Sequence, residues 1–183
     1  MGTTNYSIRK LSPSDNCKKF RSGDQAFAPL KTFLQKQACN FQESMIGISY
    51  VCIERNDNNE ETGKVLAYMT LTSSEIDLGD AYAVDDCPKA NRYATLPALK
   101  ITRLAVDANQ RGSGLGSVLV DMAIAIALDE IAPAIGCRFL IADVKTEAVD
   151  FYYKNGFNFL DTPENHATEH PAMFIDLKTL EEF

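Results

Sequence analysis

A glycine-rich junction near the middle of the chain constrains its fold more than any other feature. Residues 99–106 are apolar and β-branched, residues 110–116 read Gln-Arg-Gly-Ser-Gly-Leu-Gly, and helical periodicity follows from about 114 to 132. When a strand leads through a glycine turn into a helix, free backbone N–H groups and the positive end of the helix dipole point to one place. Arg111 adds a guanidinium to the same place. The junction therefore predicts an anion-binding site.

Two familiar phosphate-binding motifs do not fit this junction. A Walker A loop requires a lysine and then a serine or threonine after its last glycine, where this chain has Leu115 and Gly116. A dinucleotide fingerprint requires a third glycine where Ser117 stands. A turn that only starts a helix needs neither an arginine nor three glycines. The pattern excludes a nucleoside triphosphatase, disfavours a dinucleotide enzyme, and favours another phosphate-bearing ligand.

Length and composition predict one soluble globular domain over residues 1–183. The chain has 183 residues, 45% of them hydrophobic, and five cysteines that never form a Cys-x-x-Cys pair. This spacing suggests neither a zinc site nor a disulfide framework, and we expect a reducing, cytoplasmic location. No stretch resembles a signal peptide or a membrane span, so no membrane partner is expected.

The charge is unevenly distributed along the chain. Residues 1–55 carry eight basic and four acidic side chains, residues 56–86 carry eight acidic side chains and one lysine, and the net charge is −7. The acidic stretch is expected to be a solvated surface. The total charge argues against a nucleic-acid-binding protein.

Hydrophobic periodicity predicts a mixed α/β (α+β) fold, with helices on the faces of a mixed sheet. Segment 73–98 has weak periodicity and is interpreted as an insertion or an acceptor-side loop with one short helix. The expected strands are 6–11, 49–55, 64–72, 99–106, 139–144, 157–160 and 172–177, and the expected helices are about 30–41, 114–132 and 147–154.

Two motifs carry a resemblance to a known family. Residues 110–116 resemble the Q/R-x-x-G-x-G/A acetyl-CoA loop of the GNAT (Gcn5-related) N-acetyltransferases, and 148–157, Ala-Val-Asp-Phe-Tyr-Tyr-Lys-Asn-Gly-Phe, resemble the family's A-x-x-x-Y-x-x-x-G-F segment. The second motif follows the first at the distance that this fold requires. The resemblance implies a mostly antiparallel sheet that splays between its two central strands, and acetyl-CoA as co-substrate.

The resemblance also implies specific site residues. The loop and Arg111 would bind the diphosphate of acetyl-CoA, and the backbone of Leu104 and Val106 would bind the pantetheine arm and the thioester oxygen, with their side chains in the core. The expected cofactor-binding residues are Leu104, Ala105, Val106, Arg111, Gly112, Ser113, Gly114, Leu115, Gly116 and Ser117. No metal is expected, because His166 and His170 have no third ligand nearby.

Tyr152 is the catalytic candidate. A primary amine would attack the thioester directly in a ternary complex, and the phenol would give a proton to the departing sulfur. Several family members have a glutamate base where Lys100 stands, and many have an asparagine near Lys145. The general base is therefore unassigned, which suits an α-amine of pKa about 7.7–8.0.

Further segments are similar to the acetyltransferase toxins of toxin–antitoxin pairs, namely 20–23, 30–38, 50–51 and 103–107. This similarity implies aminoacyl-tRNA as acceptor, an antitoxin as partner, and phosphate contacts from Lys18, Lys19, Arg21, Lys31 and Lys36. The sequence pI of about 4.8 argues against RNA binding. A small-molecule or peptide amine acceptor and a non-catalytic acyl-CoA-binding module remain open alternatives. A homodimer is also common in the family.

Overall fold

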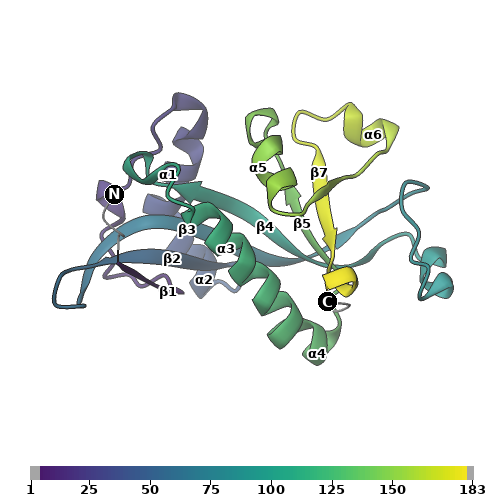
Figure 1. Ribbon diagram of the computed structural model, residues 1–183, viewed down its shortest axis with the longest axis horizontal. Coiled ribbons are helices and arrows are strands. Elements are labelled where there is room, and N and C mark those ends of the chain that lie inside the picture. The colour runs from purple at the N-terminus through teal and green to yellow at the C-terminus, as the bar shows by residue number, and fades with distance from the viewer. Residues whose placement is uncertain (1–4, 181–183) are drawn as a thin grey trace. The chain divides into compact units, whose positions relative to one another are not determined.

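The computed structural model describes residues 5–180 and contains one seven-stranded sheet of order β1-β2-β3-β4-β5-β7-β6 (Figure 1). The pairs β1–β2, β2–β3, β5–β7 and β6–β7 are antiparallel, and β4–β5 is parallel. The predicted mixed sheet is confirmed. The strands are β1 (Tyr6–Lys10), β2 (Ile48–Arg55), β3 (Glu61–Ile76), β4 (Leu96–Val106), β5 (Phe139–Asp143), β6 (Asn158–Phe159) and β7 (Ala172–Asp176).

The helices follow the predicted positions but are more divided. Around 30–41 the chain forms two helices rather than one, because Gln37 leaves the helical conformation with φ −126° and ψ −29°. The long predicted helix consists of an α-helix, a π-helical turn (Ile126–Ile131) and a short α-helix that ends at Gly136. The α-helices are α1 (Ala28–Lys36), α2 (Ala38–Glu43), α3 (Leu115–Ala125), α4 (Ala132–Ile135), α5 (Val149–Lys154) and α6 (Pro163–His166).

The chain divides into two compact units. Unit 1 contains the residues up to Thr72 and Thr102–Leu119, and unit 2 contains Ser73–Ile101 and the residues from Val120 onward. Strands β3 and β4 and helix α3 each contribute to both units. One domain over 1–183 stays a prediction.

The core of unit 1 joins the first two helices to β2 and β3. Phe33 and Leu34 are the buried residues of α1, and they belong to the same buried cluster as Val51 and Tyr68. The ring of Tyr68 contacts Phe20 edge to face at 5.7 Å, and its hydroxyl donates to the carbonyl of Leu30 at 2.7 Å. This buried tyrosine therefore has a partner for its polar end as well as apolar packing.

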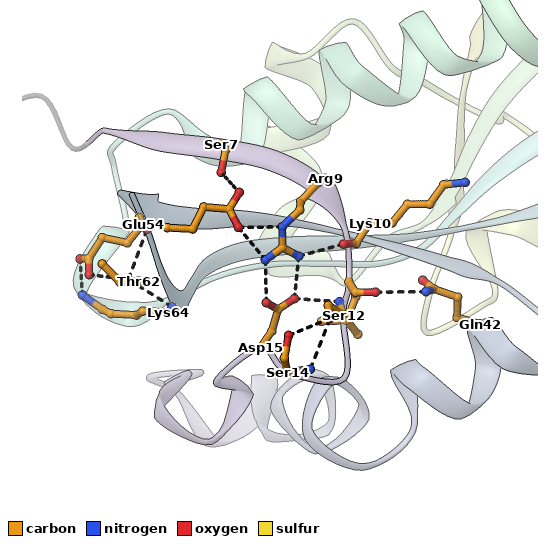
Figure 2. A network of polar contacts seen from close by, with 12 residues as sticks. Ser7, Arg9, Lys10, Ser12, Ser14, Asp15, Gln42, Glu54, Thr62 and Lys64 are labelled. Carbon is orange, nitrogen blue, oxygen red and sulfur yellow. Dashed lines mark hydrogen bonds and ion pairs between the residues drawn. The ribbon is translucent and has the colours of Figure 1, made fainter. Parts of the chain in front are cut away.

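A polar network crosses the surface of unit 1 (Figure 2). Arg9 on β1 lies 2.7 Å from the carboxylate of Asp15 and 2.8 Å from that of Glu61. The side chain of Asp15 is only 2% exposed and also accepts from the amide of Ser12. Arg9 therefore connects β1, the loop after it and the start of β3.

Segment 77–95 of unit 2 is held against the sheet by polar contacts and by buried apolar residues such as Leu78 and Val84. Arg138 binds Asp176 at 2.6 Å and Asp86 at 2.8 Å, and the hydroxyl of Tyr82 donates to Asp176 at 2.8 Å. The predicted boundaries of this insertion were wrong, because β3 continues to Ile76 and β4 begins at Leu96. At residues 73–76 the pairing of β3 in the sheet outweighs the polar composition, and at the other end Ala98 pairs with Phe139 of β5. The predicted short helix is present as a 3-10 helix at Pro88–Arg92.

No helix within residues 5–180 is long and apolar enough to span a membrane.

Candidate active site

The predicted anion-binding loop forms as expected at the end of β4. A 3-10 helix (Ala108–Gln110) follows the strand, and α3 begins at Leu115. Gly112 and Gly114 have φ of +76° and +85°, and no atom lies within 4 Å of a Cβ built on either residue. These glycines are therefore required by backbone conformation and not by a close neighbour. The amides of Leu115, Gly116 and Ser117 lie in the first turn of α3, where the helix has no carbonyl to accept from them, so they can donate to an anion. The amide of Val118 already donates to the carbonyl of Gly114 at 3.1 Å.

Asp107 is a buried residue at the start of the loop that was not among the predicted site residues. Its carboxylate is 3% exposed and accepts from the amides of Arg21 at 2.7 Å and Asn109 at 3.0 Å. Its own amide donates to the carbonyl of Leu66 at 2.8 Å. An aspartate directly after an apolar strand and before a helical turn is a common N-cap, and that signal identifies the residue.

Arg111 is exposed and held on one side. Its Nη2 donates to the carbonyl oxygen of Ser22 at 2.6 Å, and its guanidinium carbon lies 5.4 Å from the centre of the Phe27 ring. A guanidinium has five N–H donors, so most of them remain for a ligand.

The other predicted cofactor-binding residues lie along β4 and the loop in unit 1. Leu104, Ala105 and Val106 are half-buried, and Ala105 packs against the buried cluster of unit 1. The placement of the Leu104 and Val106 side chains in the core stays a prediction. Strand β4 pairs with β5 over Ala98–Ile101 and continues beyond this pairing to Val106. Exposure varies in the rest of the set: Gly112, Ser113 and Gly114 are exposed, Ser117 is half-buried, and Leu115 and Gly116 are buried.

Tyr152 lies on α5 in unit 2 and is 7% exposed. Its ring contacts Phe151 at 5.2 Å and Phe157 at 5.0 Å, both edge to face. Burial, with a smaller contribution from the charge of Asp143, raises the pKa of Tyr152 above its ordinary value. The phenol is therefore protonated at neutral pH and able to donate. Tyr153 is half exposed.

Lys100, which the family resemblance leads us to expect in place of a glutamate base, forms an ion pair. Its Nζ is 2.6 Å from Asp143 Oδ2, between β4 and the end of β5. His166 pairs with Asp161 at 2.6 Å. Within the described residues, no group of three His, Cys, Asp or Glu side chains could hold a metal ion.

Comparison with known proteins agrees with this geometry. Residues 49–159 match the acetyltransferase (GNAT) domain family. A curated relative, the tRNA-acetylating toxin of Mycobacterium tuberculosis, is 29% identical over 159 residues, which cover 86% of this chain and 87% of the relative.

Solved structures share the fold. AtaT complexed with acetyl-methionyl-tRNAfMet is 24% identical with a TM-score of 0.79, and the match covers 97% of this chain and 98% of AtaT. A tyrosine-to-phenylalanine mutant of KacT is 23% identical with a TM-score of 0.80 and the same coverage. A mutant of AtaT bound to the C-terminus of the antitoxin AtaR is 23% identical with a TM-score of 0.73, and the match covers 97% and 96% of the two chains. With the family match spanning more than half of its length, the chain belongs to the GNAT acetyltransferase family.

Proposed function

We propose that this chain transfers the acetyl group of acetyl-CoA to the α-amine of aminoacyl-tRNA. The observation that carries the proposal is the similarity to a tRNA-acetylating toxin over 159 residues, which are 86% of the chain. An activity of this kind belongs in the cytoplasm, and a protein antitoxin is the expected partner.

The donor set of the loop suits acetyl-CoA. Arg111 and the amides of Gly112 and of residues 114–117 would bind the diphosphate, because the guanidinium is cationic and the amides carry partial positive charge. The amide of Ser113 donates to the carbonyl of Gln110 at 3.2 Å. The backbone of Leu104 and Val106 would bind the pantetheine arm and the thioester oxygen. Acetyl-CoA supplies an acetyl group that is activated as a thioester.

Tyr152 would act as the acid in the transfer. The acceptor nitrogen forms a bond to the acetyl carbon, the carbon–sulfur bond breaks, and the phenol donates its proton to the departing sulfur. The acceptor nitrogen loses a proton in the same reaction, and this proton replaces the one that the phenol gave to the sulfur. Because burial keeps the phenol protonated, it is ready to donate before each turnover.

The distribution of charge supports an RNA acceptor despite the acidic total. Unit 1 contains 11 basic and 8 acidic residues, whereas unit 2 contains 7 basic and 17 acidic residues. Lys18, Lys19, Arg21, Lys36 and Arg103 are exposed in unit 1. Exposed basic side chains would provide the salt-dependent contacts with phosphate that RNA binding requires.

The test is the transfer of label from acetyl-CoA to RNA. Purified protein is incubated with radiolabelled acetyl-CoA and either total aminoacylated tRNA or the same tRNA after deacylation. We expect label only in aminoacylated tRNA, strongly reduced in Tyr152→Phe and unchanged in Tyr153→Phe, which alters the neighbouring exposed ring. No transfer by a protein that binds acetyl-CoA contradicts the tRNA acceptor and favours a smaller amine. Equal transfer by Tyr152→Phe contradicts the role of Tyr152.

A further inference from the structure

A short segment from the N-terminal part of unit 1 is bonded to the glycine loop at three points. The amide of Arg21 donates to Asp107 at 2.7 Å, and the amide of Ala108 donates back to the carbonyl of Arg21 at 2.9 Å. The guanidinium of Arg111 donates to the carbonyl of Ser22 at 2.6 Å. Arg21 and Ser22 therefore hold the two ends of the stretch 107–111, although they lie 86 and 89 residues before Asp107 and Arg111 in the sequence.

Gly23 allows this close approach. Its φ is +77°, and a Cβ at this position would lie 3.0 Å from Nη2 of Arg111 and 3.2 Å from Cβ of Ala108. Gly63 of the same unit has a similar φ of +74°, but nothing lies within 4 Å of its Cβ position. A Cβ at Gly23 would therefore push the Arg111 guanidinium away from its present position by a few tenths of an ångström, whereas one at Gly63 would only strain its own backbone.

The contacts restrict Arg111 before any ligand arrives. The carbonyl of Ser22 binds one edge of the guanidinium, and the ring of Phe27 lies 5.4 Å from its central carbon. A long side chain that is already ordered loses less conformational entropy when it binds, so affinity rises without a new contact.

We propose that Ser22, Gly23 and Asp107 are positioning residues that hold Arg111 in place to bind the diphosphate of acetyl-CoA. The inference rests on the proposed function, since it concerns the same cofactor site. It adds a role for the Phe20–Gly23 segment, which lies far from the glycine loop in sequence.

The first experiment compares two glycine substitutions by calorimetric titration with acetyl-CoA. We expect Gly23→Ala to weaken binding about tenfold and Gly63→Ala to change it less than about twofold. Both substitutions strain a positive φ, so similar losses of thermal stability are expected in the two variants. Phe27→Leu, which leaves Gly23 in place, is expected to weaken binding about threefold.

Two further measurements separate positioning from general damage. S-acetylpantetheine lacks the diphosphate, so its affinity should be the same in wild type and Gly23→Ala. In an Arg111→Met background, Gly23→Ala should weaken acetyl-CoA binding no further, because the residue that it displaces is already absent.

The outcomes distinguish this inference from the proposed function. If the wild type binds acetyl-CoA and Gly23→Ala binds it equally well, the inference is overturned and the proposed function stands. Equal loss of S-acetylpantetheine affinity, or an additive effect of Gly23→Ala in the Arg111→Met background, also overturns it. A wild-type chain that binds no acetyl-CoA overturns both.

Discussion

The ammonium group of Lys100 lies 2.6 Å from the carboxylate of Asp143, and Asp143 in turn acts electrostatically on Tyr152. Lys100 is paired with Ile141 in the parallel register of β4 and β5, two residues before Asp143. Lys100 is thus a cation that compensates the neighbouring carboxylate of Asp143. The pair offers no free base, which agrees with an acceptor that arrives as a neutral α-amine.

Removing the positive charge of Lys100 should slow acetyl transfer. In Lys100→Met the carboxylate of Asp143 is no longer compensated and opposes negative charge on the sulfur beside Tyr152, so we expect kcat to fall about three- to tenfold. Lys100→Met combined with Asp143→Asn should recover most of the rate, because the two charges are removed together. Single-turnover transfer rates measure this, with Lys154→Met on exposed α5 surface as the control. A double variant as slow as Lys100→Met would refute the electrostatic role.

Replacing the phenol of Tyr152 should affect chemistry and not binding. We expect Tyr152→Phe to lower kcat about 100-fold, in the range for loss of a general acid, with little change in the KM for acetyl-CoA. Stability should change little, because the structure records no hydrogen bond from this hydroxyl to residues 5–180.

The pH profile provides an independent check of Tyr152. Since burial raises its pKa above the ordinary value of 10, ionisation of the phenol should not reduce the rate at pH 9 to 10. A decrease of the rate between pH 9 and 10 that is present in the wild type and absent in Tyr152→Phe would show that the phenol ionises in its normal range.

Among the ion pairs in Figure 2, those with a buried partner should contribute more to the free energy of unfolding than those with exposed partners. Arg9→Met leaves the carboxylate of Asp15 buried without its cation, and we expect it to lower the free energy of unfolding by about 3 kcal/mol. Lys64→Met removes a pair with Glu54 in which the two side chains are 39% and 28% exposed, and should cost less than about 1 kcal/mol. Urea unfolding of both variants measures the difference. Equal losses would show that the burial of Asp15 is irrelevant.

Alkaline solution should destabilise the fold through its buried thiols. Burial raises the pKa of Cys52 from 9.0 to about 12, so the folded state holds this proton more tightly than the unfolded state. Its contribution is complete below pH 9 and is lost as the pH rises towards 12, with a loss of about 2 kcal/mol by pH 10.5. Urea unfolding at pH 8 and 10.5 measures the loss, and Cys52→Ala should reduce it. An identical pH dependence in Cys52→Ala would show that this thiol does not contribute.

Local patterns were sufficient for the elements and for the glycine loop. Alternating apolar residues predict strands such as β2, and only glycine adopts the positive φ of Gly112 and Gly114 without strain. These signals come from neighbouring residues, so they can be interpreted without knowledge of the fold. The same reasoning failed at Gln37, which divides the predicted helix in two. It also failed at the ends of segment 73–98, which belong to β3 and β4 because strand pairing outweighed the local signal.

Partnerships between distant residues depended on the fold. The pairs Arg111 with Ser22, Asp107 with Arg21 and Lys100 with Asp143 form because the order and register of strands bring their segments together. The net charge of −7 likewise concealed a basic unit 1 and an acidic unit 2. A pattern along the chain shows which residues are polar, apolar or charged, but strand order and register select the partners that they meet.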